Sequence, residues 1–125
     1  MDEQNKIISN QITFDDFEKV EIRIGTVVEA TVPDWSHWVM RIKADFGEDL
    51  GIKQAFSGIM KFYKPEDLVG KQFPFVVNLK PKTIGPDKEL SEVMMIMVDP
   101  GEGDNDVRPV PFNLNEKVPN GVKVR

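Results

Sequence analysis

Lys80 and Lys82, held apart by a proline, are the residues of this 125-residue chain best suited to bind an anion. Asn78 stands just before them, near the end of an apolar segment over residues 73–79, and Ser91 stands just before a second apolar segment. Lysine neutralises phosphate, while amides and hydroxyls can form hydrogen bonds to bases or sugars. If both segments are strands, the two cations, the amide and the hydroxyl gather at one edge of a sheet, which is an arrangement typical of a binding site.

The charge of the chain is unevenly distributed. The net charge of −5 argues against a protein that coats nucleic acid in bulk. Residues 52–92 nevertheless contain seven lysines and five acidic residues, so this segment carries +2 and the rest of the chain carries −7. The asymmetry permits a local basic surface. Because the chain contains no cysteine, disulfides, thiolate nucleophiles and iron–sulfur sites are excluded.

β-Branched and alternating apolar residues predict five main strands. These strands are expected over residues 20–32, 38–46, 52–57, 72–79 and 93–99. A small helix is expected over residues 64–70, where a proline stands near the start and a glycine at the end. Five strands with a helix after the third match the order of an OB-fold, a partly open Greek-key barrel that often binds oligonucleotides. The sequence therefore predicts an all-β, five-stranded OB-fold barrel.

Short extensions are predicted at both ends of a single domain that covers residues 13–125. Residues 1–12 are expected to form a flexible leader. A helical turn should follow, N-capped by Thr13, with Phe14 and Phe17 on one apolar face as a structural plug. The tail, residues 107–125, contains three prolines and can supply only short edge strands.

The second and third predicted strands place cations on one outer face. In residues 38–46 the apolar side chains alternate with polar ones, so the core face is expected to hold Trp38, Met40, Ile42, Ala44 and Phe46. The opposite, polar face then carries Arg41, Lys43 and Asp45, joined by Lys53 of the next strand. In the first strand, Gly25 is expected to mark a bulge or a barrel bend.

Aromatic and sulfur-containing side chains offer a second kind of binding surface. Trp35 could stack on a base or bury a peptide side chain, and both alternatives stay open. His37 beside it has no assigned role, because a lone histidine on a loop is usually incidental. The methionines at 94, 95 and 97 are most simply core residues, although flexible methionine also suits an adaptable apolar surface, and Met94 is kept as a candidate.

No catalytic or membrane-spanning pattern is present in the sequence. The chain has no nucleophile elbow, phosphate-binding glycine loop or histidine-rich metal spacing, so we predict neither an enzyme nor a bound cofactor or metal. No apolar run approaches the ~18 residues that a transmembrane helix needs. The sequence therefore predicts a cytoplasmic protein without a membrane partner.

Several longer motifs resemble the tRNA-binding domain family, which includes the C-terminal domain of bacterial methionyl-tRNA synthetases. The segment at residues 16–27 is similar to the opening of that domain, residues 57–71 to its middle and residues 78–82 to its second half. Other details resemble the CsaA-like branch of the family. They lie in residues 45–54, 91–93, 100–104 and 118–121.

The resemblance implies an OB-fold, no catalysis and a homodimer built partly from the chain ends. It also implies an export-related chaperone that binds unfolded polypeptide and tRNA; the alternative is a dedicated tRNA-binding protein that assists aminoacylation. The residues expected to bind tRNA or peptide are Trp35, Arg41, Lys43, Lys53, Asn78, Lys80, Lys82, Ser91 and Met94. A partner chain is expected to bury apolar residues of the tail, namely Val107, Val110, Phe112, Leu114, Val118 and Val122.

Overall fold

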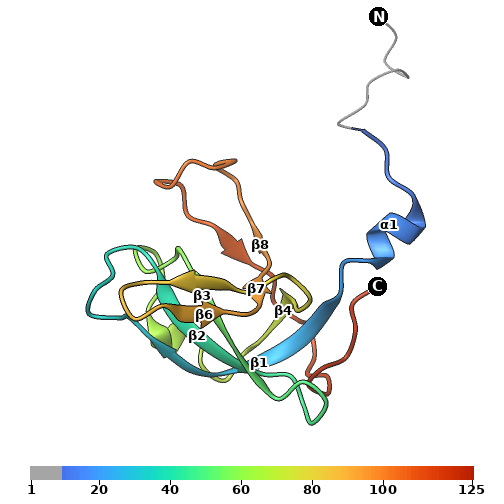
Figure 1. Cartoon of the computed structure of the whole chain (residues 1–125), viewed down its shortest axis with the longest axis horizontal. Coiled ribbons are helices and arrows are strands. Elements are labelled where there is room, and N and C mark those ends of the chain that lie inside the picture. The colour runs from blue at the N-terminus through green and yellow to red at the C-terminus, as the bar shows by residue number, and fades with distance from the viewer. Residues whose placement is uncertain (1–9) are drawn as a thin grey trace, which may run out of the picture.

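The computed structural model describes residues 10–125 and shows a five-stranded antiparallel sheet curled into a nearly closed barrel (Figure 1). Most of the predicted leader lies outside the described residues. The strand order in the sheet is β3-β2-β1-β4-β7. The strands are β1 (Ile22–Thr31), β2 (Met40–Asp45), β3 (Ile52–Ser57), β4 (Gln72–Val76) and β7 (Met94–Met95).

Backbone hydrogen bonds between β3 and the segment before β7 close the barrel. The N–H groups of Glu92 and Val93 both donate to the carbonyl of Gln54, at 2.7 and 3.3 Å. Between β3 and β4 lies a single 3₁₀ turn, η2 (Pro65–Asp67), and Leu68 after it is buried in the core. The predicted five-stranded barrel with a small helix after the third strand is therefore confirmed.

The alternation in β2 positions its side chains as expected, except at its start. Met40, Ile42 and Ala44 are fully buried, and Phe46 beyond the strand is buried as well. Trp38, however, is 45% exposed, because β2 begins only at Met40. The assignment of Trp38 to the core is thus wrong: the residue belongs to the loop before the strand, where the alternation no longer applies.

Gly25 is needed for close packing against an aromatic ring and does not form a β-bulge. A Cβ atom at this position would lie 2.7 Å from the ring of Phe46, which packs edge-on against Phe75 at 5.2 Å between ring centroids. The bulge in β1 instead falls between Val27 and Glu29, where the pairing with β2 shifts register. The glycine is needed because an aromatic ring crosses the strand there.

Two short ribbons that extend from the barrel complete the β-structure. The hairpin of β5 (Lys82–Ile84) and β6 (Glu89–Ser91) pairs only with itself, and no strand over residues 82–91 was predicted from the sequence. The predicted strand over residues 93–99 is divided, since β8 (Met97–Val98) leaves the barrel and pairs with β9 (Val110–Pro111). Short edge pairing of the tail is what its prolines allow.

The helix α1 (Phe14–Glu18) stands away from the barrel (Figure 1). The predicted cap is confirmed, because the Thr13 hydroxyl accepts a hydrogen bond from the backbone N–H of Asp16. Phe14 and Phe17 lie on one face, yet they are 70% and 41% exposed. The prediction of a plug is therefore wrong for a single chain. Of the helices in residues 10–125, none is both long and apolar enough to cross a bilayer.

The C-terminal segment returns to the barrel and is held there by polar contacts. Gln72 clasps the backbone of Val118 from both sides: its amide donates to the carbonyl at 2.7 Å, and its amide oxygen accepts from the N–H at 3.0 Å. The Thr26 hydroxyl donates to the side chain of Asn120. The last residues then run beside β1, where the Ile24 N–H donates to the carbonyl of Val122.

Candidate nucleic-acid interface

A groove with cations at its lip lies between the end of β4, the β5–β6 hairpin and β7. We call it the basic groove; it has a volume of about 470 Å³. Lys80 and Lys82 are exposed at its rim, and no salt bridge to either is found among residues 10–125. The groove is lined by Phe56, Leu79, Lys80, Lys82, Ile84, Ser91, Glu92, Val93 and Met94. Cations above an apolar floor suit a ligand that is anionic on one side and aromatic or aliphatic on the other.

The hairpin brings Lys82 and Ser91 together, as the sequence predicted. The two residues are directly paired across β5 and β6. The Ser91 hydroxyl accepts a hydrogen bond from the Phe56 N–H at 3.2 Å, which ties the hairpin to β3. Because a hydroxyl is both donor and acceptor, Ser91 still has a proton to donate to a ligand in the groove.

The outer face of β2 and β3 carries Arg41 and Lys43 as predicted, and each of them faces a carboxylate. Lys53 is paired with the buried Ala44 and therefore lies on the opposite face, so its assignment to the outer face is wrong. It too has an acidic partner. Lys43 lies 3.6 Å from Glu29, and Lys53 lies 3.9 Å from a carboxylate oxygen of Glu92. Arg41 makes a two-pronged contact with Glu89 of β6, with 2.8 Å between its Nε and Oε1. The cations of the predicted polar face are therefore already neutralised by carboxylates.

The Arg41–Glu89 pair is the dominant electrostatic contact of this face. Hydrogen bonding to Glu89 raises the pKa of Arg41 above its ordinary value. The same contact lowers the pKa of Glu89, and the charges of Arg41 and Lys43 act in the same direction. Glu89 is thus an ionised carboxylate at neutral pH.

Asn78 forms hydrogen bonds to the backbone and does not line the basic groove. Its side-chain oxygen accepts from the Glu21 N–H at 2.9 Å, and its amide donates to the Lys19 carbonyl at 2.7 Å. The two bonds pin the linker between α1 and β1 to the end of β4. These contacts support a positioning role for Asn78.

Trp35 is half-buried and lies against the hairpin. Its ring packs on Phe56 at 6.1 Å between centroids, and a Cβ atom at Gly85 would lie only 2.5 Å from it. The close approach explains why a glycine occupies the hairpin turn at this point. Trp35 therefore braces the hairpin, while the neighbouring His37 is exposed and lines none of the grooves described here.

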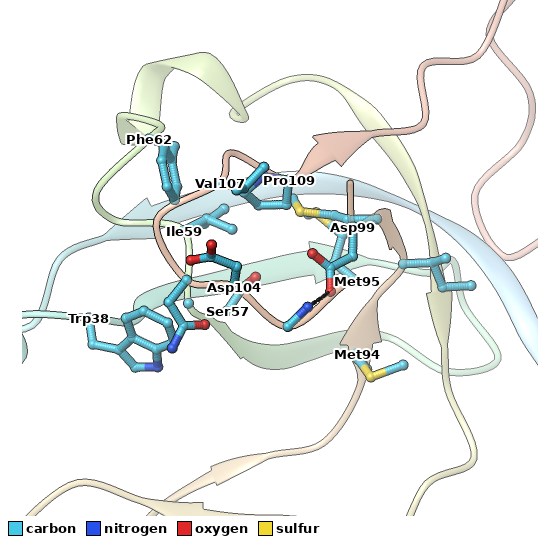
Figure 2. Close-up of a pocket in the computed structure, with 15 residues that line it drawn as sticks. Trp38, Ser57, Ile59, Phe62, Met94, Met95, Asp99, Asp104, Val107 and Pro109 are labelled. Carbon is cyan, nitrogen blue, oxygen red and sulfur yellow. Dashed lines mark hydrogen bonds between the residues drawn. The ribbon is translucent and has the colours of Figure 1, made fainter. Parts of the chain in front are cut away.

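A second groove, which we call the methionine groove, lies on the other side of β7 (Figure 2). Its volume is about 360 Å³, and Met94 lines both grooves. Trp38 lies at one end, with its ring against Gly58, while Asp99 and Asp104 contribute the acidic part of the wall. The apolar part is made by Trp38, Ile59, Phe62, Met94, Met95, Ile96, Met97, Val107 and Pro109.

The methionines behave differently from one another. Met95 is buried and Met97 packs against the core, as expected for core residues. Met94 is 50% exposed, so the simple core interpretation is wrong for this residue. Strand alternation explains the difference, since neighbouring side chains in β7 point to opposite faces.

Several residues of the two grooves were not predicted from the sequence. Phe56, Leu79 and Ile84 form the floor of the basic groove, and Glu89 neutralises Arg41. The hairpin did have a signal, since a Gly-Pro-Asp turn sequence follows Ile84. The partner of Arg41 had no local signal. Within the described part of the chain, no group of three or more acidic or histidine side chains is arranged to hold a metal ion.

Comparison with known proteins agrees with these features. The family model described as "Putative tRNA binding domain" matches residues 22–123. Methionine–tRNA ligase 1 of Bacillus anthracis is 38% identical over 94% of this chain, but the match covers only 16% of the ligase.

Two solved structures match over nearly the whole chain. The chaperone CsaA from Bacillus anthracis has a TM-score of 0.80 and 36% identity, covering 93% of this chain and 100% of its own. A MetRS-related protein from Pyrococcus horikoshii has a TM-score of 0.82 and 29% identity, covering 94% and 100%. The motifs, the barrel and the match over residues 22–123 together establish that this chain belongs to the tRNA-binding domain family and resembles its CsaA-like members.

Proposed function

We propose that this protein is a non-catalytic binding protein that takes up tRNA through the basic groove. The observation that supports the proposal best is the placement of Lys80 and Lys82 at the rim, without a carboxylate partner among the described residues, above a largely apolar floor. Lysines so placed can contact phosphates, and Ser91 can donate to a base or sugar oxygen. Such a role would place the protein in the cytoplasm, as an accessory to aminoacylation or translation.

The acidic balance of the chain shapes the expected binding. The net charge is −5, and Arg41, Lys43 and Lys53 are already paired with carboxylates. The protein can therefore contact only a few phosphates at once. Unpaired bases of a folded RNA could rest on Phe56 and Met94, since stacking on an aromatic ring contributes ~1–3 kcal/mol per base. The proposal therefore favours a structured RNA with exposed bases over long nucleic acid bound by charge alone.

Titration of unfractionated tRNA against salt tests the proposal. If each protomer contacts about two phosphates, the logarithm of the affinity should fall with the logarithm of salt with a slope of roughly −1.4 to −1.8 per groove. Fluorescence anisotropy of labelled tRNA gives this slope directly. Undetectable binding at ~50 mM salt, or binding independent of salt, would contradict tRNA as the ligand.

We further propose that the protein is a homodimer joined through its chain ends. In the single chain the tail leaves apolar side chains more than one third exposed: Val107, Val110, Phe112, Leu114 and Val122. On the N-terminal side, Ile12, Phe14, Phe17 and Val20 are 41–70% exposed. Water-exposed apolar residues at both ends of one domain support burial against a second copy.

A second candidate function, binding of unfolded polypeptide, is supported by the methionine groove. Trp38 and Met94 are half-exposed in the apolar part of the lining, and flexible methionine adapts to side chains of different shape. Two structural relatives are named chaperone CsaA, which adds to this support. An export-related chaperone role for this chain would use this groove.

Replacing Trp38 and Met94 by alanine should at least halve the ability of the protein to suppress aggregation of a chemically unfolded client. The reason is the loss of apolar contact area in the groove, worth ~25 cal/mol per Å². Light scattering of the client measures the effect. The matched control replaces Ile52 and Val69 by alanine, since both are exposed apolar residues that line neither groove. Equal suppression by wild-type protein and the Trp38/Met94 variant would exclude this groove.

A further inference from the structure

Arg41 is held in position from three sides. Its Nη1 donates to the Thr31 hydroxyl at 3.1 Å, and its guanidinium carbon lies 5.8 Å from the centre of the Phe56 ring. The remaining edge, formed by Nε and Nη2, faces the carboxylate of Glu89 with two parallel hydrogen bonds. Two of the three supports, Thr31 and Phe56, belong to the barrel itself, so the guanidinium would stay oriented if Glu89 moved away.

Glu89 comes from an element that is joined to the barrel by few contacts. The β5–β6 hairpin adds no strand to the five-stranded sheet. Its β6 strand is tied to β3 by the Gln54 side-chain amide, which donates to the Leu90 carbonyl at 3.0 Å, and by the Phe56 N–H, which donates to the Ser91 hydroxyl at 3.2 Å. The turn of the hairpin touches Trp35 at Gly85. These contacts and the Arg41 pair hold the hairpin over the outer face of β2 and β3.

A carboxylate presents two oxygens to a guanidinium in the same way as a phosphate does. We propose that Arg41 is a second phosphate-binding site, occupied in the free protein by Glu89, and that the β5–β6 hairpin is a flap that nucleic acid displaces on binding. The inference rests on the proposed RNA-binding function and deepens it. Glu89, like any glutamate with an ordinary or lowered pKa, is charged at neutral pH, so phosphate must compete with a charged group.

The placement of the flap connects this site with the basic groove. Lys82 and Ser91 line that groove and belong to the same hairpin as Glu89. Because Lys82 would move with the hairpin, a bound RNA would contact Lys80 and Arg41 on the barrel and Lys82 on the displaced flap. In the free protein, Glu89 lowers the apparent affinity for RNA, because a ligand must first compete with it.

The variant Glu89→Gln tests the proposal, since it removes the charge while keeping the size and one acceptor. Its affinity for unfractionated tRNA at ~0.1 M salt should rise roughly fivefold, with a salt slope steeper by ~0.7–0.9, as expected for one additional phosphate contact. The matched control is Glu29→Gln, which removes the same charge beside Lys43 on the same face. Its affinity should change less than twofold. The double variant Glu89→Gln/Arg41→Gln should lose the gain.

A separate readout shows whether the flap moves. In a Trp38→Phe background, the fluorescence of Trp35, which packs on Phe56 and Gly85, should change on addition of tRNA to the wild-type hairpin.

The affinity measurements distinguish the two proposals. A Glu89→Gln variant that melts like wild type but binds no more tightly than Glu29→Gln would overturn the inference while leaving tRNA binding intact. If the Glu89→Gln variant bound tRNA and the wild-type protein did not, the flap would be supported and the proposed binding of tRNA by the wild-type protein would be contradicted. Absence of binding by both would overturn both proposals.

Discussion

Replacing Lys80 and Lys82 together by glutamine is expected to weaken tRNA binding roughly 30-fold at ~0.1 M salt and to reduce the salt slope by ~1.4–1.8 per groove. The reason is that each lysine at the rim releases about one counterion from the RNA when it contacts phosphate. Fluorescence anisotropy at several salt concentrations measures both quantities. Because the two side chains are exposed and have no ion pair in the described chain, stability should change little.

The control for this prediction is the pair Lys64→Gln/Lys123→Gln. It changes the net charge by the same amount, both residues are exposed, and neither lines the basic groove. A specific site at the groove predicts that the control keeps affinity within about threefold, as expected for long-range attraction alone. If both double variants lost affinity equally, the interaction would be non-specific charge attraction, and the groove would not be the site.

Substituting Phe14 and Phe17 by aspartate should convert the dimer into a monomer at micromolar concentration. Burying a phenylalanine side chain contributes ~1.5–3 kcal/mol, and a two-fold interface buries each residue twice. The dimer should therefore weaken at least ~1,000-fold. Light scattering or sedimentation measures the mass. Of the two new acidic residues, the one that replaces Phe14 suits the dipole at the start of α1, whereas the one that replaces Phe17 lies in its last turn and opposes it.

Two outcomes would contradict the dimer proposal. One is a wild-type protein that is monomeric at micromolar concentration. The other is a variant that stays dimeric, which would place the interface elsewhere. The control Ile52→Asp/Val69→Asp introduces the same charges at exposed apolar positions far from α1 in the sequence, and it should remain dimeric. Circular dichroism of all variants separates loss of the interface from loss of the fold.

The barrel could be predicted because its signals are local. Alternation in residues 40–46 shows which side chains face the core, and the order of five strands with one helical turn after the third leaves few architectures. The capping of α1 by Thr13 was equally local, since the donor is only three residues away. The hairpin that carries Glu89 was missed because its strands are only three residues long and resemble a polar loop.

The character of the site was decided by contacts between distant segments. Alternation placed Arg41 on the outer face but could not show that Glu89, 48 residues later, would neutralise it. Trp35 and Trp38 stand three residues apart, yet one braces the hairpin and the other lines the methionine groove, because the loop between them turns before β2 begins. Likewise, only the tertiary structure shows that the apolar face of α1 packs against no other part of the described chain, which leaves Phe14 and Phe17 exposed.

Lys80 and Lys82 show what is decided by the sequence and what is decided by the tertiary structure. Their types and spacing, after a strand and before a serine, were sufficient to identify candidates for anion binding, because strand ends place side chains at a sheet edge. The tertiary structure decided that Lys80 and Lys82 stay unpaired among the described residues while Arg41, Lys43 and Lys53 are matched by acids. Periodicity reports the face of a strand, whereas the partner of a charge depends on how the barrel closes.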